Sequence, residues 1–181
     1  MTEFGAKLMW AERQAQARLA PQIESLRSDL ERAFAVAFDA NAHVVTLYAS
    51  HDDALATLRE QHPGQDGSAR LLVGLKDGQT VESVLLPRDG LCVSSQVGCA
   101  VGCVFCMTGR EGLIRQVGSA EIVAQVALAR TLRPVKKVVF MGMGEPSHNL
   151  DQVMEAIDWL GTVGNIGHKN LVFSTVGDER V

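Results

Sequence analysis

Three cysteines at short, unequal intervals are the residues of this sequence best suited to chemistry. Cys99, Cys103 and Cys106 follow the spacing C-x3-C-x2-C, and Gly98 and Gly102 give their loop the backbone freedom to wrap around a ligand. Three thiolates can bind three irons of a cubane and leave the fourth iron open. Ferredoxin clusters use four cysteines with a different spacing. The pattern therefore predicts a [4Fe–4S] cluster with one open iron.

A structural zinc site is the alternative interpretation of the same thiols. Such a site takes four ligands, usually as two separated pairs. The sequence contains four cysteines, and the fourth, Cys92, lies seven residues before Cys99, within or at the start of a predicted strand. A non-catalytic zinc-binding module is thus a second hypothesis. Disulfides among the last three cysteines are disfavoured, because these residues are too crowded for a useful staple.

Residues that could contact a ligand also follow the next two predicted strands. The run Met141–Pro146 contains Gly142 and Gly144, which let the backbone approach a ligand, and Glu145, which can accept hydrogen bonds from an ammonium group. Ser174 lies near the end of the following strand. Each has a plain structural interpretation as a turn glycine, a loop carboxylate or a strand-end hydroxyl. Because α/β folds bind ligands at the carboxyl ends of strands, one cofactor beside the cysteines explains them together.

The elements that must position these residues alternate between strand and helix from Leu91 onward. The sequence predicts strands at Leu91–Gln96, Lys137–Met141 and Leu171–Val176. The middle one is continuously apolar, as expected of a parallel strand buried on both faces. Ser119 and Asn149 are the predicted caps of the two intervening helices. This order predicts an α/β fold with parallel strands and helical crossovers, either an open sheet or part of a barrel.

The first part of the chain has a different pattern. Apolar residues recur at intervals of three and four and predict packing helices over residues 1 to about 40, with Pro21 opening the second stretch. A short strand is expected at His43–Tyr48. The run Ser50–Asp53 resembles a capping box, which predicts a helix containing Leu55 and Leu58.

A hairpin is predicted between this region and the parallel strands. After a loop at Pro63–Gly67, the β-rich runs Ala69–Leu75 and Thr80–Leu86 are joined around Asp77-Gly78, a dipeptide that favours a tight turn. We therefore divide the chain into residues 1–88, a small α+β region with helices and a hairpin, and residues 89–181, the parallel unit.

Composition sets broad limits on function. The 181 residues are 46% hydrophobic and 21% charged, which is typical of a globular domain. The formal net charge of −4 gives no general basic field for nucleic acid, although a local patch could still bind one. No run reaches the length of a membrane span and the start has no signal pattern, so we expect a cytoplasmic protein.

Between Val81 and about Gly177 the chain resembles the RlmN/Cfr family of radical S-adenosylmethionine (SAM) RNA methyltransferases. The resemblance rests on the run Leu91–Cys99, on the cysteine triplet with Phe105–Gly109, and on Gly142–Pro146. The run Ser119–Gln125 also resembles the family. The first of these motifs is specific, because most radical SAM enzymes lack the cysteine at the place of Cys92.

The resemblance implies roles for individual residues and a partial radical SAM (β/α) barrel. Cys99, Cys103 and Cys106 would bind the cluster, and the residues in contact with SAM would be Gly144, Glu145 and Ser174. Glu82 falls in the run Glu82–Pro87, which fits the family's pattern for a proton acceptor. Cys92 would release product by forming a disulfide with a second, methyl-carrying cysteine. Without the resemblance, Glu82 would be an outward-facing strand residue and Cys92 a small buried hydrophobe.

The chemistry that the resemblance implies is methylation of an adenosine carbon in ribosomal RNA, with transfer RNA as a further substrate. One SAM methylates the distal cysteine, and a second is cleaved at the cluster to a deoxyadenosyl radical that activates this methyl group. A reductant protein such as flavodoxin and a monomeric state are also implied. The resemblance does not distinguish carbon 2 from carbon 8 of adenosine, nor ribosomal from transfer RNA as the substrate.

Two departures from the family's pattern set further expectations. The first eighty residues lack its usual N-terminal helical pattern, and no cysteine follows Cys106. We therefore expect either a fragment truncated after the third barrel strand or an unusual short relative, and in both cases a chain that is inactive alone. A radical SAM protein acting on another substrate is the nearest alternative.

Overall fold

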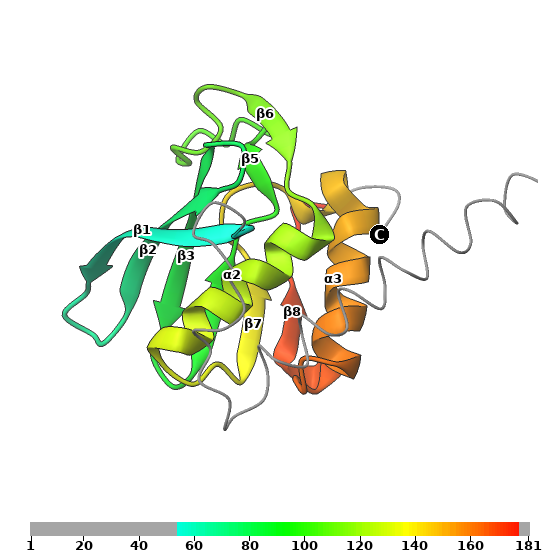
Figure 1. The fold of residues 1–181 in the computed structure, drawn as a ribbon. Coiled ribbons are helices and arrows are strands. Elements are labelled where there is room, and N and C mark those ends of the chain that lie inside the picture. The colour runs from blue at the N-terminus through cyan, green and yellow to red at the C-terminus, as the bar shows by residue number, and fades with distance from the viewer. Residues whose placement is uncertain (1–53, 178–181) are drawn as a thin grey trace, which may run out of the picture.

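A six-stranded sheet forms the centre of residues 54–177, the part of the chain that the computed structural model describes (Figure 1). Its strand order is β1-β2-β3-β4-β7-β8, antiparallel from β1 to β4 and parallel from β4 through β7 to β8. No helix within these residues is long and apolar enough to cross a membrane.

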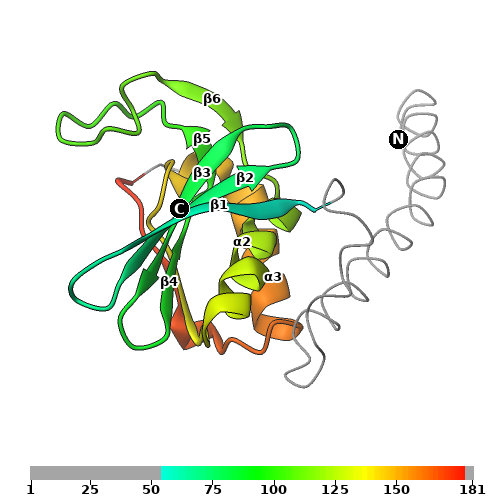
Figure 2. The same cartoon turned by 60° about the vertical axis from the view of Figure 1, so that its left-hand side comes forward.

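The parallel half confirms the predicted alternation of strands and helices. Its elements are β4 (Gly90–Val93), α2 (Ser119–Leu132), β7 (Lys137–Phe140), α3 (Leu150–Thr162) and β8 (Leu171–Phe173), with short 3-10 turns η3 (Pro146–Asn149) and η4 (His168–Asn170). Both α-helices cover the same face of the sheet (Figure 2). The predicted strands are longer than the observed ones: Leu91–Gln96 is divided after Val93, and the third strand ends at Phe173.

The antiparallel half contains one confirmed hairpin and one corrected element. β2 (Ala69–Leu75) and β3 (Thr80–Leu86) pair as predicted, and Gly78 adopts the positive φ of 88° that the turn requires. The helix predicted to contain Leu55 and Leu58 is wrong. These residues precede or lie in β1 (Ala56–Pro63), whose backbone groups pair with β2. The predicted helices over residues 1–40 and the strand His43–Tyr48 lie outside the described residues.

The predicted boundary between residues 88 and 89 lies in the turn between β3 and β4. These two strands are paired neighbours of the same sheet, with Val84 opposite Cys92. The division into two domains stays a prediction.

Side chains alternate between a helix-covered face and a second face of the sheet. Val81, Leu85, Leu91 and Phe140 are almost completely buried in the core beneath the helices. They are joined there by helix residues that include Ile122, Val126, Val153 and Leu160. Burial of each such side chain contributes roughly 1.5–3 kcal/mol. Because strand residues alternate, Glu82, Val84 and Cys92 lie on the opposite face.

The helix starts differ in detail from the predicted caps. The cap of α2 is Gly118, one residue before Ser119, and its N–H donates to the Glu121 carboxylate at 2.9 Å. Asn149 stands at the cap position of α3, but its amide instead donates to the carbonyls of Ser95 and Val117, at 2.8 and 2.7 Å. Asn149 therefore fastens the start of α3 to the segments before and after the cysteine loop.

A second, two-stranded sheet was not predicted. β5 (Gln96–Gly98) pairs antiparallel with β6 (Leu113–Gln116), and the residues between them form the cysteine loop. Figure 1 shows this hairpin beyond the upper end of the main sheet. It places the cysteines at the carboxyl end of β4.

Candidate functional site

The cysteine loop is closed at its base by contacts that only glycine allows. The Cys99 N–H donates to the Gly112 carbonyl at 3.0 Å, and the Cys106 N–H donates to the Cys103 carbonyl at 3.0 Å. Gly98 has a φ of 76°, and a Cβ there would lie 2.1 Å from the Gly112 oxygen. Any larger residue at Gly98 would therefore open the loop.

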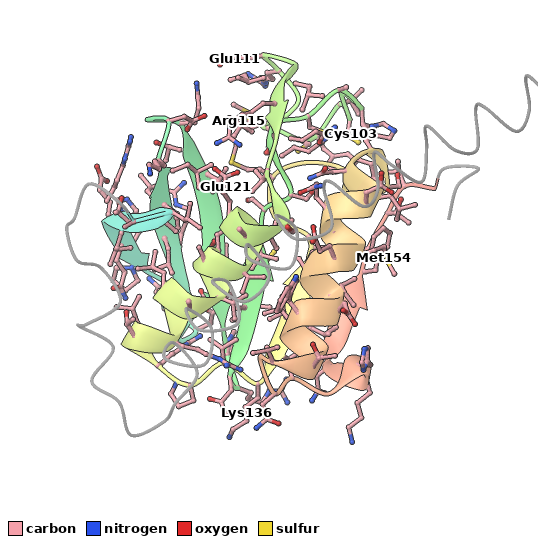
Figure 3. All side chains as sticks on the ribbon, turned by 45° about the vertical axis from the view of Figure 1, so that its right-hand side comes forward. Cys103, Glu111, Arg115, Glu121, Lys136 and Met154 are labelled. Atoms are coloured by element: carbon pink, nitrogen blue, oxygen red, sulfur yellow. The ribbon has the colours of Figure 1, made fainter. Side chains whose placement is uncertain are left out.

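A cavity of about 260 Å³ lies between this loop and the carboxyl ends of β7 and β8. All three cysteines of the triplet line it. Gly144, Glu145 and Ser174 line it as well, together with flanking residues such as Phe105, Thr108 and Thr175. Three segments that are far apart in the sequence thus meet around one cavity. It lies at the end of the sheet where Figure 3 shows Cys103, and Lys136 marks the other end.

The thiols differ in their surroundings. Cys99 is buried, whereas Cys103 and Cys106 are half-buried, and all are free. Hydrogen bonds from the backbone and side chain of Thr108 lower the pKa of Cys106, which favours the thiolate that binds metals. Within residues 54–177, no three His, Cys, Asp or Glu side chains are grouped closely enough to hold a single metal ion.

Glu145 is a buried carboxylate in the cavity wall, only 4% exposed. One oxygen accepts the Ser147 N–H and the other accepts the Val176 N–H, each at 3.0 Å. Burial alone raises the pKa of Glu145, but hydrogen bonds from Thr175, Val176 and Ser147 together outweigh it, and the net shift is downward. Glu145 is therefore ionised at neutral pH, and its negative charge lies in the wall of the cavity.

Gly142 and Gly144, in the loop after β7, lie close to the protein's own chain as well as to the cavity. Gly144 has a φ of 100°, and a Cβ there would lie 2.5 Å from the Cβ of Gln96. A Cβ at Gly142 would lie 2.7 Å from the Val93 carbonyl. Both glycines are needed for the loop to lie against the segment 93–96.

Glu82 and Cys92 do not line the cavity, although both lie on the face of the sheet opposite the helices. The Glu82 carboxylate forms an ion pair with Arg70 at 3.2 Å, and both side chains are substantially exposed. Burial raises the pKa of the Cys92 thiol, which also accepts a hydrogen bond from the backbone of Met141, a residue of the cavity wall. Cys92 thus lies directly behind the cavity wall at Met141, whereas the exposed Glu82 side chain does not contribute to that wall.

The sequence analysis did not predict a role for three buried polar side chains near the site. Gln96 accepts the Glu145 N–H at 2.8 Å. Ser94 accepts the Met143 N–H at 2.8 Å and donates to the Glu82 carbonyl. Gln125 of α2 accepts from the Ser83 hydroxyl and the Ser94 N–H, both at 2.9 Å. The signal in the sequence is the polar run Ser94–Gln96, which interrupts an otherwise apolar stretch.

Comparison with known proteins shows which family residues 93–179 resemble. Residues 93–179 match the model of the Radical SAM superfamily. A solved structure titled as a radical SAM methyltransferase from Sphaerobacter thermophilus superposes with a TM-score of 0.64 at 38% identity, over 69% of this chain and 40% of that one. Residues 93–179 are therefore similar to the radical SAM superfamily, and the fold of the described residues agrees with the predicted partial barrel.

Curated relatives are similar over a longer stretch. A protein of Leptothrix cholodnii is 86% identical over 129 residues, and one of Azoarcus sp. is 84% identical over 129 residues; both are named "Probable RNA methyltransferase". Each alignment covers 71% of this chain and 37% of the relative, so the chain spans little more than a third of their length. These relatives are thus named as enzymes, which agrees with the expectation from the sequence.

Proposed function

We propose that this radical SAM domain is the cofactor-binding part of an RNA methyltransferase of the RlmN/Cfr type. The observation that supports it best is the single cavity shared by the cysteine triplet, Glu145 and Ser174. Chance placement would not bring three thiols, an ionised buried carboxylate and a strand-end hydroxyl to one edge of a sheet.

The residues present fit a cluster and SAM. Cys99, Cys103 and Cys106 would hold three irons, and the loop around them leaves the cavity side open. Gly144, Glu145 and Ser174 would contact SAM, with the Glu145 carboxylate accepting from its ammonium group. When bound, the cluster supplies the electron that cleaves SAM reductively. Phe105 and Val176 also line the cavity and are largely exposed, so they would supply apolar contacts to the bound cofactor at the cavity rim.

Glu82 would accept the proton from the methylated base, and Cys92 would resolve the covalent adduct. Their common sheet face supports this part of the proposal, although the buried Cys92 thiol would have to become accessible before it reacts. Arg70 would hold the Glu82 carboxylate in place until then. The raised pKa of Cys92 means that this thiol would have to lose its proton to a base before it attacks.

The RNA substrate is proposed from the names of the curated relatives. Resemblance to the RlmN/Cfr family specifies it further as an adenosine carbon in ribosomal RNA, with transfer RNA as a further substrate. A reductant protein such as flavodoxin, a monomeric state and a cytoplasmic location complete the proposal. The cavity shared by the three cysteines, Glu145 and Ser174 favours it over the zinc-binding module, which would need a fourth ligand beside the thiols.

Reconstitution tests the metal site directly. The chain is incubated anaerobically with iron and sulfide, desalted, and analysed for iron and for visible absorbance. We expect a brown protein with about four irons per chain, because three thiolates suffice to seat a cubane. Cys99→Ala, Cys103→Ala and Cys106→Ala should each abolish the absorbance. The matched control is Cys92→Ala, which should keep it.

Stoichiometric zinc binding without iron uptake would contradict the proposal. Equal iron loss in Cys92→Ala and in the triplet variants would also contradict the assignment of these three ligands.

A further inference from the structure

Gln96 connects the two loops that form the proposed cofactor site. It is completely buried, begins β5 and precedes Cys99 by three residues. Its side-chain oxygen accepts the Glu145 N–H at 2.8 Å, and its side-chain nitrogen donates to the Gln116 oxygen at 2.9 Å. Gln116 in turn donates to the His148 carbonyl at 2.9 Å. The amide of Gln96 therefore has contacts on both of its ends.

The backbone around Gln96 is fastened to the same loop. The N–H groups of Ser95 and Gln96 both donate to the Met143 carbonyl, at 2.9 and 3.1 Å. Gly144 lies so close to Gln96 that a Cβ on the glycine would be 2.5 Å from its Cβ. Residues 143–145 are thus held against Gln96 by the backbone, by the side chain and by van der Waals contact.

We infer that Gln96 is a positioning residue, which fixes the Glu145 loop relative to the cysteine loop and so aligns the amino-acid end of bound SAM with the open iron. This inference rests on the proposed function. A glutamine suits the task because its uncharged amide presents one acceptor to Glu145 and one donor to Gln116. An apolar side chain of similar length would leave the Glu145 N–H buried without its partner.

Gln125 provides a matched control, because it is also a completely buried glutamine with hydrogen bonds at both ends of its amide. It accepts from Ser83 and Ser94 and donates to the Ser94 carbonyl at 3.0 Å. It lies on α2 and does not line the cavity. Loss of its amide should cost stability, and it can affect the Glu145 loop only indirectly, through Ser94, whose hydroxyl accepts the Met143 N–H.

The experiment compares Gln96→Met with Gln125→Met in the reconstituted chain. Iron content, melting temperature, the SAM dissociation constant and the EPR spectrum of the reduced cluster with and without SAM are measured for each. We expect both variants to melt at lower temperature and to keep their iron. Only Gln96→Met should bind SAM at least tenfold more weakly and show a reduced change in the EPR spectrum when SAM is added.

A second variant covers the case in which Gln96→Met does not fold. Gln96→Glu has nearly the same shape and keeps an oxygen toward the Glu145 N–H, but it has no donor for the Gln116 oxygen. It should fold, keep its iron and bind SAM more weakly than wild type, and unchanged SAM affinity in Gln96→Glu would then contradict the positioning role. Wild-type SAM affinity in Gln96→Met, or equal losses in both methionine variants, would overturn the positioning role alone. Failure of the wild-type chain to take up iron or bind SAM would overturn the proposed function as well.

Discussion

Glu145 illustrates how a buried carboxylate can stay ionised in this fold. Its two oxygens accept N–H groups from Ser147 in its own loop and from Val176 just after β8. Such charge-assisted bonds stabilise the anion more than burial destabilises it, which is why its pKa is lowered. The same bonds join the ends of β7 and β8, so Glu145 both shapes the cavity and presents charge to it.

Replacement of this charge should weaken SAM binding without loss of the cluster. In Glu145→Gln a neutral amide would face the ammonium group of SAM. A hydrogen bond to a charged group contributes roughly 1.5–3 kcal/mol, which corresponds to a loss of affinity of about tenfold or more. Equilibrium dialysis of the reconstituted protein gives the dissociation constant, and iron analysis is the control. An unchanged dissociation constant would remove Glu145 from the SAM site.

The lowered pKa of Glu145 also predicts how stability depends on pH. A depressed pKa contributes stability above the ordinary value of 4.5, and this contribution is lost as the pH falls through the lowered value. Glu145→Gln should therefore be less stable than wild type at neutral pH, and the difference should shrink under acid conditions. Urea denaturation across this pH range measures the difference. A difference that stays constant into acid would mean that the carboxylate's charge does not stabilise the fold.

Among the elements, the β5–β6 hairpin depends on one arginine for its attachment. The Arg115 guanidinium donates to Asp77 at 2.6 Å and to both Glu121 oxygens at 2.8 Å. Asp77 belongs to the β2–β3 turn and Glu121 to the first turn of α2, near which Figure 3 shows Arg115. These two carboxylates raise the pKa of Arg115 above its already high value. Three elements are thus connected through one side chain.

Loss of this connection should destabilise the protein more than loss of an exposed ion pair. Arg115→Met should lower the free energy of unfolding by about 1–2 kcal/mol, because a network with a bidentate pair contributes more than an isolated surface pair. The control is Lys136→Met, which removes an ion pair with Asp89 at 2.9 Å from a side chain that is 75% exposed. Its effect should be within about 0.5 kcal/mol. Urea denaturation compares them, and equal effects would contradict the role of Arg115.

Predictability from the sequence also differed among the elements. The continuous apolar run of β7 and the periodic face of α3 identify buried elements directly, so the parallel unit was predicted correctly. β1 was mistaken for a helix because a capping pattern is a local signal, whereas pairing with β2 is not. β5 and β6 are short and separated by the long cysteine loop, so no turn sequence marks their pairing. Gln96 was missed because its partners lie 20 and 49 residues away.

At the scale of the whole molecule, the sheet has a structural face that is covered by helices, and the proposed functional residues lie at its carboxyl end and on its other face. The helices cover one face and supply the core, as Figures 1 and 2 show, while the cavity lies at the carboxyl ends of the parallel strands. Glu82 and Cys92 lie on the other face. The proposed reaction would therefore use one end and one face of the same sheet, with Cys92 behind the cavity wall at Met141.

The number of cysteines limits what this chain can do by itself. The proposed transfer needs one cysteine to carry the methyl group and another to resolve the adduct, beyond the three that would hold the cluster. The sequence has four cysteines in all, so only Cys92 is left. We therefore expect the chain to bind cluster and SAM but not to methylate RNA catalytically.

The test is to incubate the reconstituted 181-residue chain with SAM, a reductant and unmodified ribosomal or transfer RNA, and then to digest the RNA and search for methyladenosine by mass spectrometry. The control for an intact radical site is 5′-deoxyadenosine, which is formed from SAM in the same mixture and should appear. Methyladenosine should not, because Cys92 is the one thiol left once the triplet holds the cluster, and the transfer needs two. Several turnovers of methyladenosine per chain would show that the reaction needs no second cysteine, and the assignment to the RlmN/Cfr mechanism would then be wrong.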